Sequence, residues 1–126
     1  MLGLFKKPPK LEIAFRPTRA VARELDREIE IDGELVIRNV GRDATLVDLA
    51  LVLIAGGTRR IDLALPAGWV GEVRLPAGGE LRQEVAWKQT LAAPMRAPAA
   101  EIQLITTAGN KVQPLATTPR FPLANE

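Results

Sequence analysis

The stretch EIEIDGELVI, residues 28–37, allows two structures that lead to different folds. An Asp-Gly pair between alternating apolar residues is a strong signal for a two-residue β-hairpin turn. In such a hairpin the directly paired residues share a face, so Glu34 would lie on the same face as Ile29 and Ile31. Each face would then mix carboxylates with aliphatic side chains, which is costly whichever face is buried.

A single continuous strand separates the same residues cleanly. Its odd positions are apolar or Gly, and its even positions are mostly charged: Ile29, Ile31, Gly33, Leu35 and Ile37 against Glu28, Glu30, Asp32, Glu34, Val36 and Arg38. This is the pattern of a strand with one buried face. We therefore predict one long strand, with Gly33 on the inner face at a bend, a bulge or a close backbone approach.

Similar alternation recurs along the chain and predicts an antiparallel β-sandwich of about seven or eight strands, arrestin-like or immunoglobulin-like. A first strand (Leu11, Ile13, Phe15) should end at Pro17, and residues 44–55 should form one central strand. The other strands lie around residues 61–65, 73–75, 81–87, 100–106 and 110–115, with turns at residues 39–43, 56–57, 66–68, 76–79 and 108–109. A helix at residues 18–26 is the alternative for that segment.

The length of 126 residues fits one domain. We expect a flexible basic N-terminal arm at residues 1–9, the sandwich at residues 10–117, and a loose C-terminal tail at residues 118–126. No stretch has the form of a secretory signal peptide or the length of a transmembrane helix, so we predict a cytoplasmic protein.

The composition excludes most of the common catalytic mechanisms. The chain contains no Cys, His, Tyr or Ser, so the common nucleophile systems and zinc sites with nitrogen or sulfur ligands are absent. We therefore predict a non-enzyme without metal or cofactor. A carboxylate-only enzyme is the remaining catalytic hypothesis, and it would need two acids about 5–10 Å apart across a cleft.

Two charged segments are the candidate partner-binding residues. The basic set at the N-terminus comprises Lys6, Lys7, Lys10, Arg16 and Arg19, and the acidic set in the long strand comprises Glu28, Glu30, Asp32 and Glu34. The basic set could bind a protein, a nucleic acid or an anionic membrane. The acidic set could dock a basic partner, but a straight strand spaces its carboxylates about 7 Å apart, which is unsuited to calcium. The alternative is that both are solvated surface.

The two Trp residues match the inner faces of their segments. We expect Trp69 and Trp87 to pack in the core, whereas an exposed Trp would indicate a binding hot spot.

Four stretches in this order resemble the bacterial sporulation-control protein family, which has the arrestin-like sandwich. They are KLEIAF, REIEIDGELVIRNVGRDATLVDLALVL, LPAGGELRQEVAW and EIQLITTAGNKV, followed by a closing Pro. The resemblance implies a non-catalytic scaffold or regulator that acts through protein contacts, here in a single-domain version.

We therefore predict a protein–protein interaction module, acting as an adaptor, regulator or assembly subunit. Exposed sheet edges could accept a partner strand, or pair with another copy to form a homo-oligomer. The alternative is a small basic module that binds nucleic acid or a membrane surface through its N-terminal arm.

Overall fold

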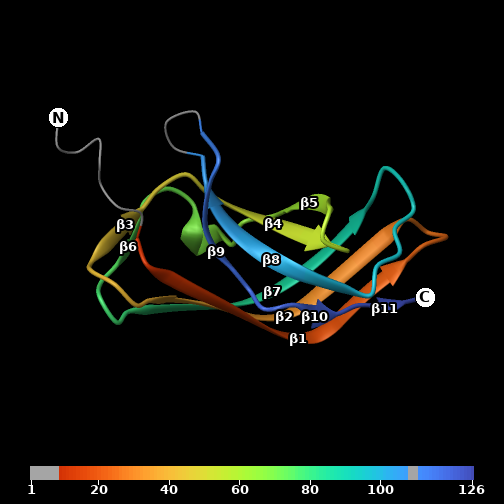
Figure 1. Cartoon of the computed structure of the whole chain (residues 1–126), viewed down its shortest axis with the longest axis horizontal. Coiled ribbons are helices and arrows are strands. Elements are labelled where there is room, and N and C mark those ends of the chain that lie inside the picture. The colour runs from red at the N-terminus through yellow and green to blue at the C-terminus, as the bar shows by residue number, and fades with distance from the viewer. Residues whose placement is uncertain (1–8, 108–110) are drawn as a thin grey trace.

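The computed structural model describes residues 9–107 and 111–126 and is built almost wholly of β-strands (Figure 1). Two sheets pack face to face, as a sandwich predicts. The first sheet has the strand order β11-β1-β2-β7, and the second has the order β10-β8-β4-β5, with β9 also paired to β8. A small two-stranded sheet, β3-β6, lies at one end of the molecule.

The described residues form eleven strands rather than seven or eight, because several short pairings carry no signal in the sequence. Their bounds are Leu11–Arg23 (β1), Glu28–Asn39 (β2), Ala44–Leu46 (β3), Leu49–Ala55 (β4), Arg59–Leu63 (β5), Val73–Leu75 (β6), Glu80–Thr90 (β7), Ala99–Thr106 (β8), Gln113–Thr117 (β9), Phe121–Pro122 (β10) and Ala124–Asn125 (β11). One turn of 3-10 helix, Ala67–Trp69, follows β5.

The long-strand prediction for residues 28–37 is confirmed. Strand β2 is continuous and lies between β1 and β7 in the first sheet. Its odd positions are buried and its even positions face outward, as the sequence indicated. The Asp-Gly pair therefore lies within a strand, because burial of one apolar face outweighs the local preference for a turn.

Gly33 marks both a bulge and a close approach. The β1–β2 register shifts between Pro17, opposite Gly33, and Arg19, opposite Asp32, so that Thr18 is an extra residue in β1. A Cβ atom on Gly33 would overlap the carbonyl oxygen of Arg16 and lie 2.8 Å from the ring of Phe15. Only Gly leaves room for the close approach of β1 to β2 at this point.

The prediction that the first strand ends at Pro17 is wrong, and the alternative of a helix at residues 18–26 is also not observed. Pro17 does not end β1, which continues through the bulge to Arg23, and residues 18–26 form no helix. Proline is tolerated here because this part of β1 is at the edge of the sheet and next to a bulge. Pairing with β2 on both sides of the bulge overrides the local signals.

The predicted central strand at residues 44–55 is divided in two. Strand β3 pairs with β6, whereas β4 pairs with β5 and β8 in the second sheet. The break lies at Val47 and Asp48, where Asp48 has a φ of 51°. Its carbonyl accepts a hydrogen bond from the backbone N–H of Thr107 at 3.0 Å, which fixes the crossing between the sheets.

The C-terminal tail is ordered by pairing, contrary to expectation. Strand β10 pairs with β8, and β11 runs parallel to β1 at Val21 and Ala22. Phe121 and Leu123 are buried in the main core. The segment looked loose because two-residue strands are too short to produce a detectable alternation.

The core between the sheets is mainly aliphatic, and both Trp residues lie in it as predicted. Trp69 is 3 % exposed and Trp87 is 6 % exposed. The ring of Phe15 lies 5.0 Å from that of Phe121 and 6.4 Å from that of Trp87. Trp87 also donates a hydrogen bond from its indole N–H to the carbonyl of Ala64 at 2.8 Å, which links β7 to the end of β5.

Candidate functional site

The outer face of the first sheet carries the predicted acidic residues of β2 between basic residues of its two neighbours. Glu28 and Glu30 each accept a hydrogen bond from Arg23 on β1, at 2.8 and 3.1 Å. Arg19 binds Glu30 from the same strand at 3.0 Å. From the other side, Arg82 on β7 binds Glu34 at 2.9 Å.

The acidic set is therefore largely neutralised within the molecule. Arg23 lowers the pKa of the Glu30 carboxyl below its ordinary value, mainly by its hydrogen bond, and Glu30 in turn raises the pKa of Arg23. Asp32 is the one member of the acidic set with no ion pair among the described residues. Three of its four carboxylates are paired with Arg side chains of the neighbouring strands, and docking of a basic partner by this set stays a prediction.

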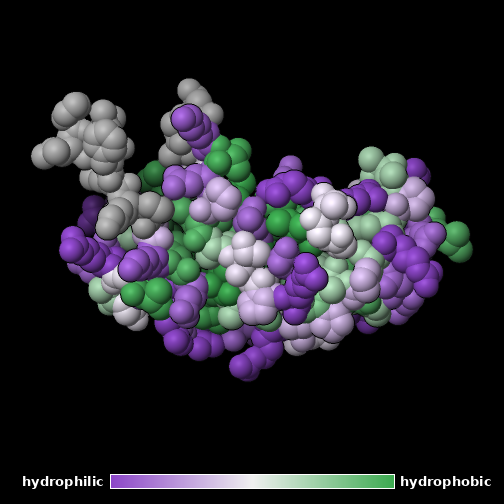
Figure 2. All heavy atoms as spheres, in the orientation of Figure 1, coloured by the Kyte–Doolittle hydropathy of each residue, from purple (hydrophilic) through white to green (hydrophobic). Residues whose placement is uncertain are grey.

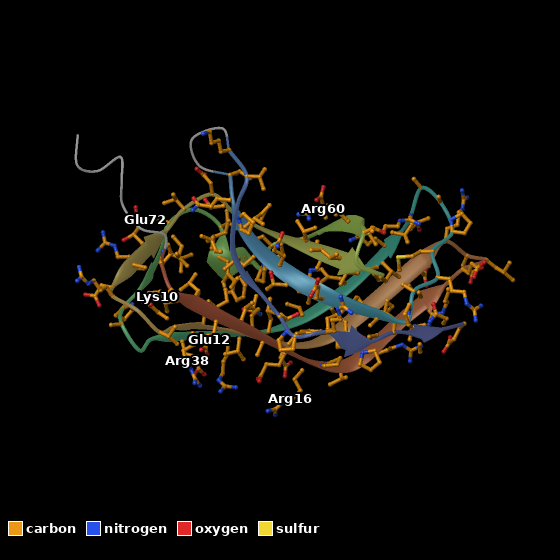
Figure 3. The ribbon with its side chains drawn as sticks, in the orientation of Figure 1. Lys10, Glu12, Arg16, Arg38, Arg60 and Glu72 are labelled. Carbon is orange, nitrogen blue, oxygen red and sulfur yellow. The ribbon has the colours of Figure 1, made fainter. Side chains whose placement is uncertain are left out.

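The basic set divides into three groups. Lys6 and Lys7 lie outside the described residues. Arg19 is used in the ion pair with Glu30. Lys10 and Arg16 are exposed and have no ion pair among residues 9–107 and 111–126, and Figure 3 shows them along the side of the molecule where β1 runs.

A hollow lies beside the first half of β1. Its volume is about 480 Å³, and its lining is mostly apolar: Leu11, Glu12, Ile13, Ala14, Val36, Arg38, Ala116, Thr117 and Pro119. It lies where β9 passes β1 without pairing with it (Figure 1). In Figure 2 hydrophobic surface appears on this part of the visible face, with hydrophilic residues beside it.

No strand in residues 9–107 and 111–126 pairs with the backbone of residues 11–16 on this side of β1. Strand β2 pairs with β1 along its whole length, but on the other edge β11 pairs only with Val21 and Ala22. Residues 11–16 therefore form a short free edge between the N-terminal end of β1 and Pro17. We call residues 11–16 together with the adjacent hollow the β1-edge site.

A second, larger hollow lies at the neighbouring end of the sandwich. Its volume is about 1170 Å³, and its lining includes Lys10, Val40, Leu46, Val47 and Leu115. Its members Lys10 and Leu115 are adjacent in sequence to Leu11 and Ala116 of the first hollow. Lys10, which lines this second hollow, therefore directly precedes the β1-edge site in the chain.

Asn39 fixes the backbone at this end and is fully buried. Its side-chain amide donates to the carbonyls of Arg42 at 2.7 Å and Leu75 at 2.8 Å, and its oxygen accepts from the N–H of Gly41 at 2.9 Å. All polar atoms of this side chain are satisfied by backbone. We therefore assign Asn39 a structural role, which holds the turn after β2 against β6.

Sequence reasoning identified Lys10 and Arg16 by charge but missed the apolar lining of the β1-edge site. The alternation in residues 28–37 places Val36 on the charged face, and no pattern in the sequence singles out Ala116 or Pro119. No local signal could find them, because the hollow forms only when β9 is brought beside β1.

Among the described residues no group of three or more acidic side chains could hold a metal ion. No helix in the same residues is long and apolar enough to cross a membrane.

The fold is similar to two solved structures over nearly the whole chain. One is the putative ApaA protein from Bordetella pertussis, with 16 % sequence identity, a TM-score of 0.52, and coverage of 94 % of this chain and 96 % of that chain. The other is a structural genomics target, SoR45, with 10 % identity, a TM-score of 0.53, and coverage of 95 % and 90 %. No family model and no curated protein matches this chain. At these identities the similarity concerns the fold alone.

Proposed function

We propose that this protein is a non-catalytic interaction module that binds an extended segment of a partner protein by strand addition at the β1-edge site. The observation that carries the proposal is the free edge of residues 11–16 beside an apolar hollow of about 480 Å³. In strand addition, main-chain hydrogen bonds supply affinity, and pockets for alternate side chains supply specificity.

The surroundings of the edge define the chemistry of the partner. The side chains of Leu11 and Phe15 point to the partly buried inner face, so alternate residues of the added strand should be apolar. Arg16 is exposed on the outer face and has no ion pair within the described part of the chain. A carboxylate opposite Arg16 would form a favourable cross-strand pair. The expected ligand is thus a segment of about five or six residues that alternates apolar side chains with at least one acid.

The family resemblance leads to the same class of function. A single-domain sandwich of the sporulation-control type would act as a scaffold or regulator through protein contacts. That membership, the absence of catalysis and the cytoplasmic location stay predictions. Binding of nucleic acid or of an anionic membrane by the basic N-terminal arm is the alternative outcome of the experiment below.

The experiment is a selection of displayed random peptides on the whole protein, followed by binding measurements on the selected peptides. Wild-type protein should enrich alternating apolar and acidic peptides. The Arg16→Glu variant should bind them about tenfold more weakly, and Ala14→Trp, which fills the hollow, should abolish binding. Ala92→Trp, at an exposed loop position away from β1, is the matched control and should bind normally.

Backbone amides provide the second readout. Binding should slow hydrogen exchange at residues 11–16 and leave β7 unchanged. Enriched peptides that still bind Ala14→Trp would contradict the proposal. A pull-down with and without nuclease at two salt concentrations separates the alternative, because capture that vanishes with nuclease or salt would point to the basic arm.

A further inference from the structure

The other edge of the first sheet is long, straight and unpaired. Strand β7 runs over eleven residues and pairs with β2 at every position without a register shift. No other strand in the described part of the chain pairs with it. It contains no Pro and no bulge, which are common means of protecting a free edge, and charged side chains are its main protection.

The inner face of β7 is incompletely covered. Trp87 is buried, but Leu81 and Val85 are only partly buried although they pack on the core. By contrast, the inner positions of β2 are all buried. A further strand beyond β7 would cover Leu81 and Val85, so the edge offers apolar area as well as backbone hydrogen bonds.

Strand β7 is also held in place by the second sheet. Besides the bond from Trp87 to Ala64, the side-chain amide of Gln89 donates to the carbonyl of Asp62 at 2.7 Å. These two contacts anchor the strand at the open side of the sandwich. A pre-positioned edge loses less entropy when a partner binds.

The charges of β7 are complementary to those of the same strand in a second, antiparallel copy. In a two-fold antiparallel pair, only registers that oppose even-numbered with even-numbered residues keep the outward side chains of both copies on one side. When the axis passes through Ala86, Glu84 lies opposite Lys88 of the second copy, and this pair occurs twice. Arg82 then faces the uncharged Thr90.

The other registers oppose like charges, use charges that are already paired, or form no charge pair. Centring on Val85 would place Arg82 opposite Lys88 twice. Centring on Gln83 would pair Arg82 with Glu84, and centring on Glu84 would pair Glu80 with Lys88 but oppose Glu84 to its own copy. Arg82 and Glu80 already bind each other at 2.6 Å, Arg82 also binds Glu34, and Glu80 also binds Arg38. Like charges directly opposite in a sheet are destabilising. Glu84 has no ion pair among the described residues, and Lys88 has only a 4.0 Å contact with Glu28, so both are available.

We propose that two copies of this chain associate through their β7 strands, centred on Ala86, and join their first sheets into one continuous sheet. The occupant of this edge is a second copy rather than another protein, because Glu84 and Lys88, the charges of β7 left without a close ion pair among the described residues, are complementary to each other about Ala86. The interface is isologous, so it closes after two copies and leaves the β1-edge site free in each.

Light scattering combined with size-exclusion chromatography tests the association directly. Wild-type protein should have twice the chain mass of 13.7 kDa. The single variants Glu84→Lys and Lys88→Glu should each weaken the dimer by about tenfold or more, because each opposes like charges twice. The matched control Glu72→Lys makes the same charge change as Glu84→Lys at an exposed loop position and should remain dimeric.

The register is tested by mixing. Glu84→Lys carries two positive charges at the paired positions and Lys88→Glu carries two negative ones, so the mixture should form heterodimers. The double variant should recover self-association. A monomeric wild type, or a dimer unaffected by both single variants, would overturn the proposal. Hydrogen exchange of wild-type β7 must also slow as concentration rises, which requires no variant.

Discussion

The two edges of the first sheet differ in length and in what lies beside them. The free part of β1 is six residues long, is followed by Pro17 and a bulge, and borders an apolar hollow. The edge of β7 is eleven residues long and regular, and carries alternating charges of both signs. A short interrupted edge beside a hollow suits a short foreign segment, whereas a long regular edge suits a symmetric copy. One sheet can therefore offer two different kinds of contact.

The largest expected change in stability tests the packing of Phe121 on Phe15 of β1. Phe121 is 5 % exposed and its ring packs on Phe15, which points inward from β1. Phe121→Ala should lower the free energy of unfolding by roughly 4 kcal/mol, because it leaves a cavity in the core. Denaturant unfolding measures the change. Leu25→Ala is the control, since Leu25 is 96 % exposed, and an equal loss there would refute the assignment.

The next effect tests the close approach of β1 and β2 at Gly33. Gly33→Ala should destabilise the protein by about 3 kcal/mol, because its Cβ would overlap backbone that cannot move aside. Gly68→Ala is the matched control, since no atom lies within 4 Å of a Cβ placed there and its φ is not positive. If Gly33→Ala is as stable as Gly68→Ala, the bulge at Thr18 does not constrain the β1 edge.

A smaller effect tests the anchor of the β7 edge. Trp87→Phe removes the indole hydrogen bond to Ala64 and should cost roughly 1–2 kcal/mol more than Trp69→Phe. Trp69 is buried to a similar extent, but its indole N–H makes no hydrogen bond to any residue that the structure describes. Thermal unfolding of both variants gives the difference. Equal losses would mean that the bond to β5 contributes nothing measurable to holding β7.

The smallest effect concerns the charged surface between the edges. Glu30 has a lowered pKa because Arg23 binds the ionised form, so its contribution to stability is present above its ordinary value of 4.5. That contribution is lost as pH falls through the lower folded value. Wild-type stability should therefore drop below about pH 4.5, and Glu30→Gln should show a shallower decline.

The control for the pH experiment is Glu12→Gln on β1, because Glu12 is exposed and has no ion pair among the described residues. Its pH profile of unfolding should match that of the wild type. If the stability of Glu30→Gln falls with pH as steeply as that of the wild type, the ion pairs of Glu30 do not contribute to the pH dependence of stability.

The fold was predictable where a single strand carried its own signal. The alternation in β2 assigns each side chain to a face, and this assignment is correct at every position from Glu28 to Ile37. The errors at Pro17 and at Asp48 are opposite, because the sequence predicts a strand end at Pro17, where the strand continues, and no break at Asp48, where the strand is divided. Strand β2 compensates at Pro17, and at Asp48 the chain leaves one sheet for another.

The candidate site was predictable only in part. Lys10 and Arg16 were identified because charge is visible in the sequence. The sequence could not show that Arg19 forms an ion pair whereas Lys10 and Arg16 form none among the described residues. That difference depends on which carboxylate lies opposite each cation on the neighbouring strand. The hollow beside them was also not visible, because Ala116 and Pro119 come from the other end of the chain.

The sequence by itself determined that this is an all-β chain, which residues of its long strand face inward, and that it lacks Cys, His, Tyr and Ser chemistry. Those properties follow from composition and from a period of two residues, both of which are local. Only the tertiary structure decided which charges are paired, which edges are free and how the last nine residues are held. These depend on register between distant segments, where a shift of one residue exchanges the two faces of a strand.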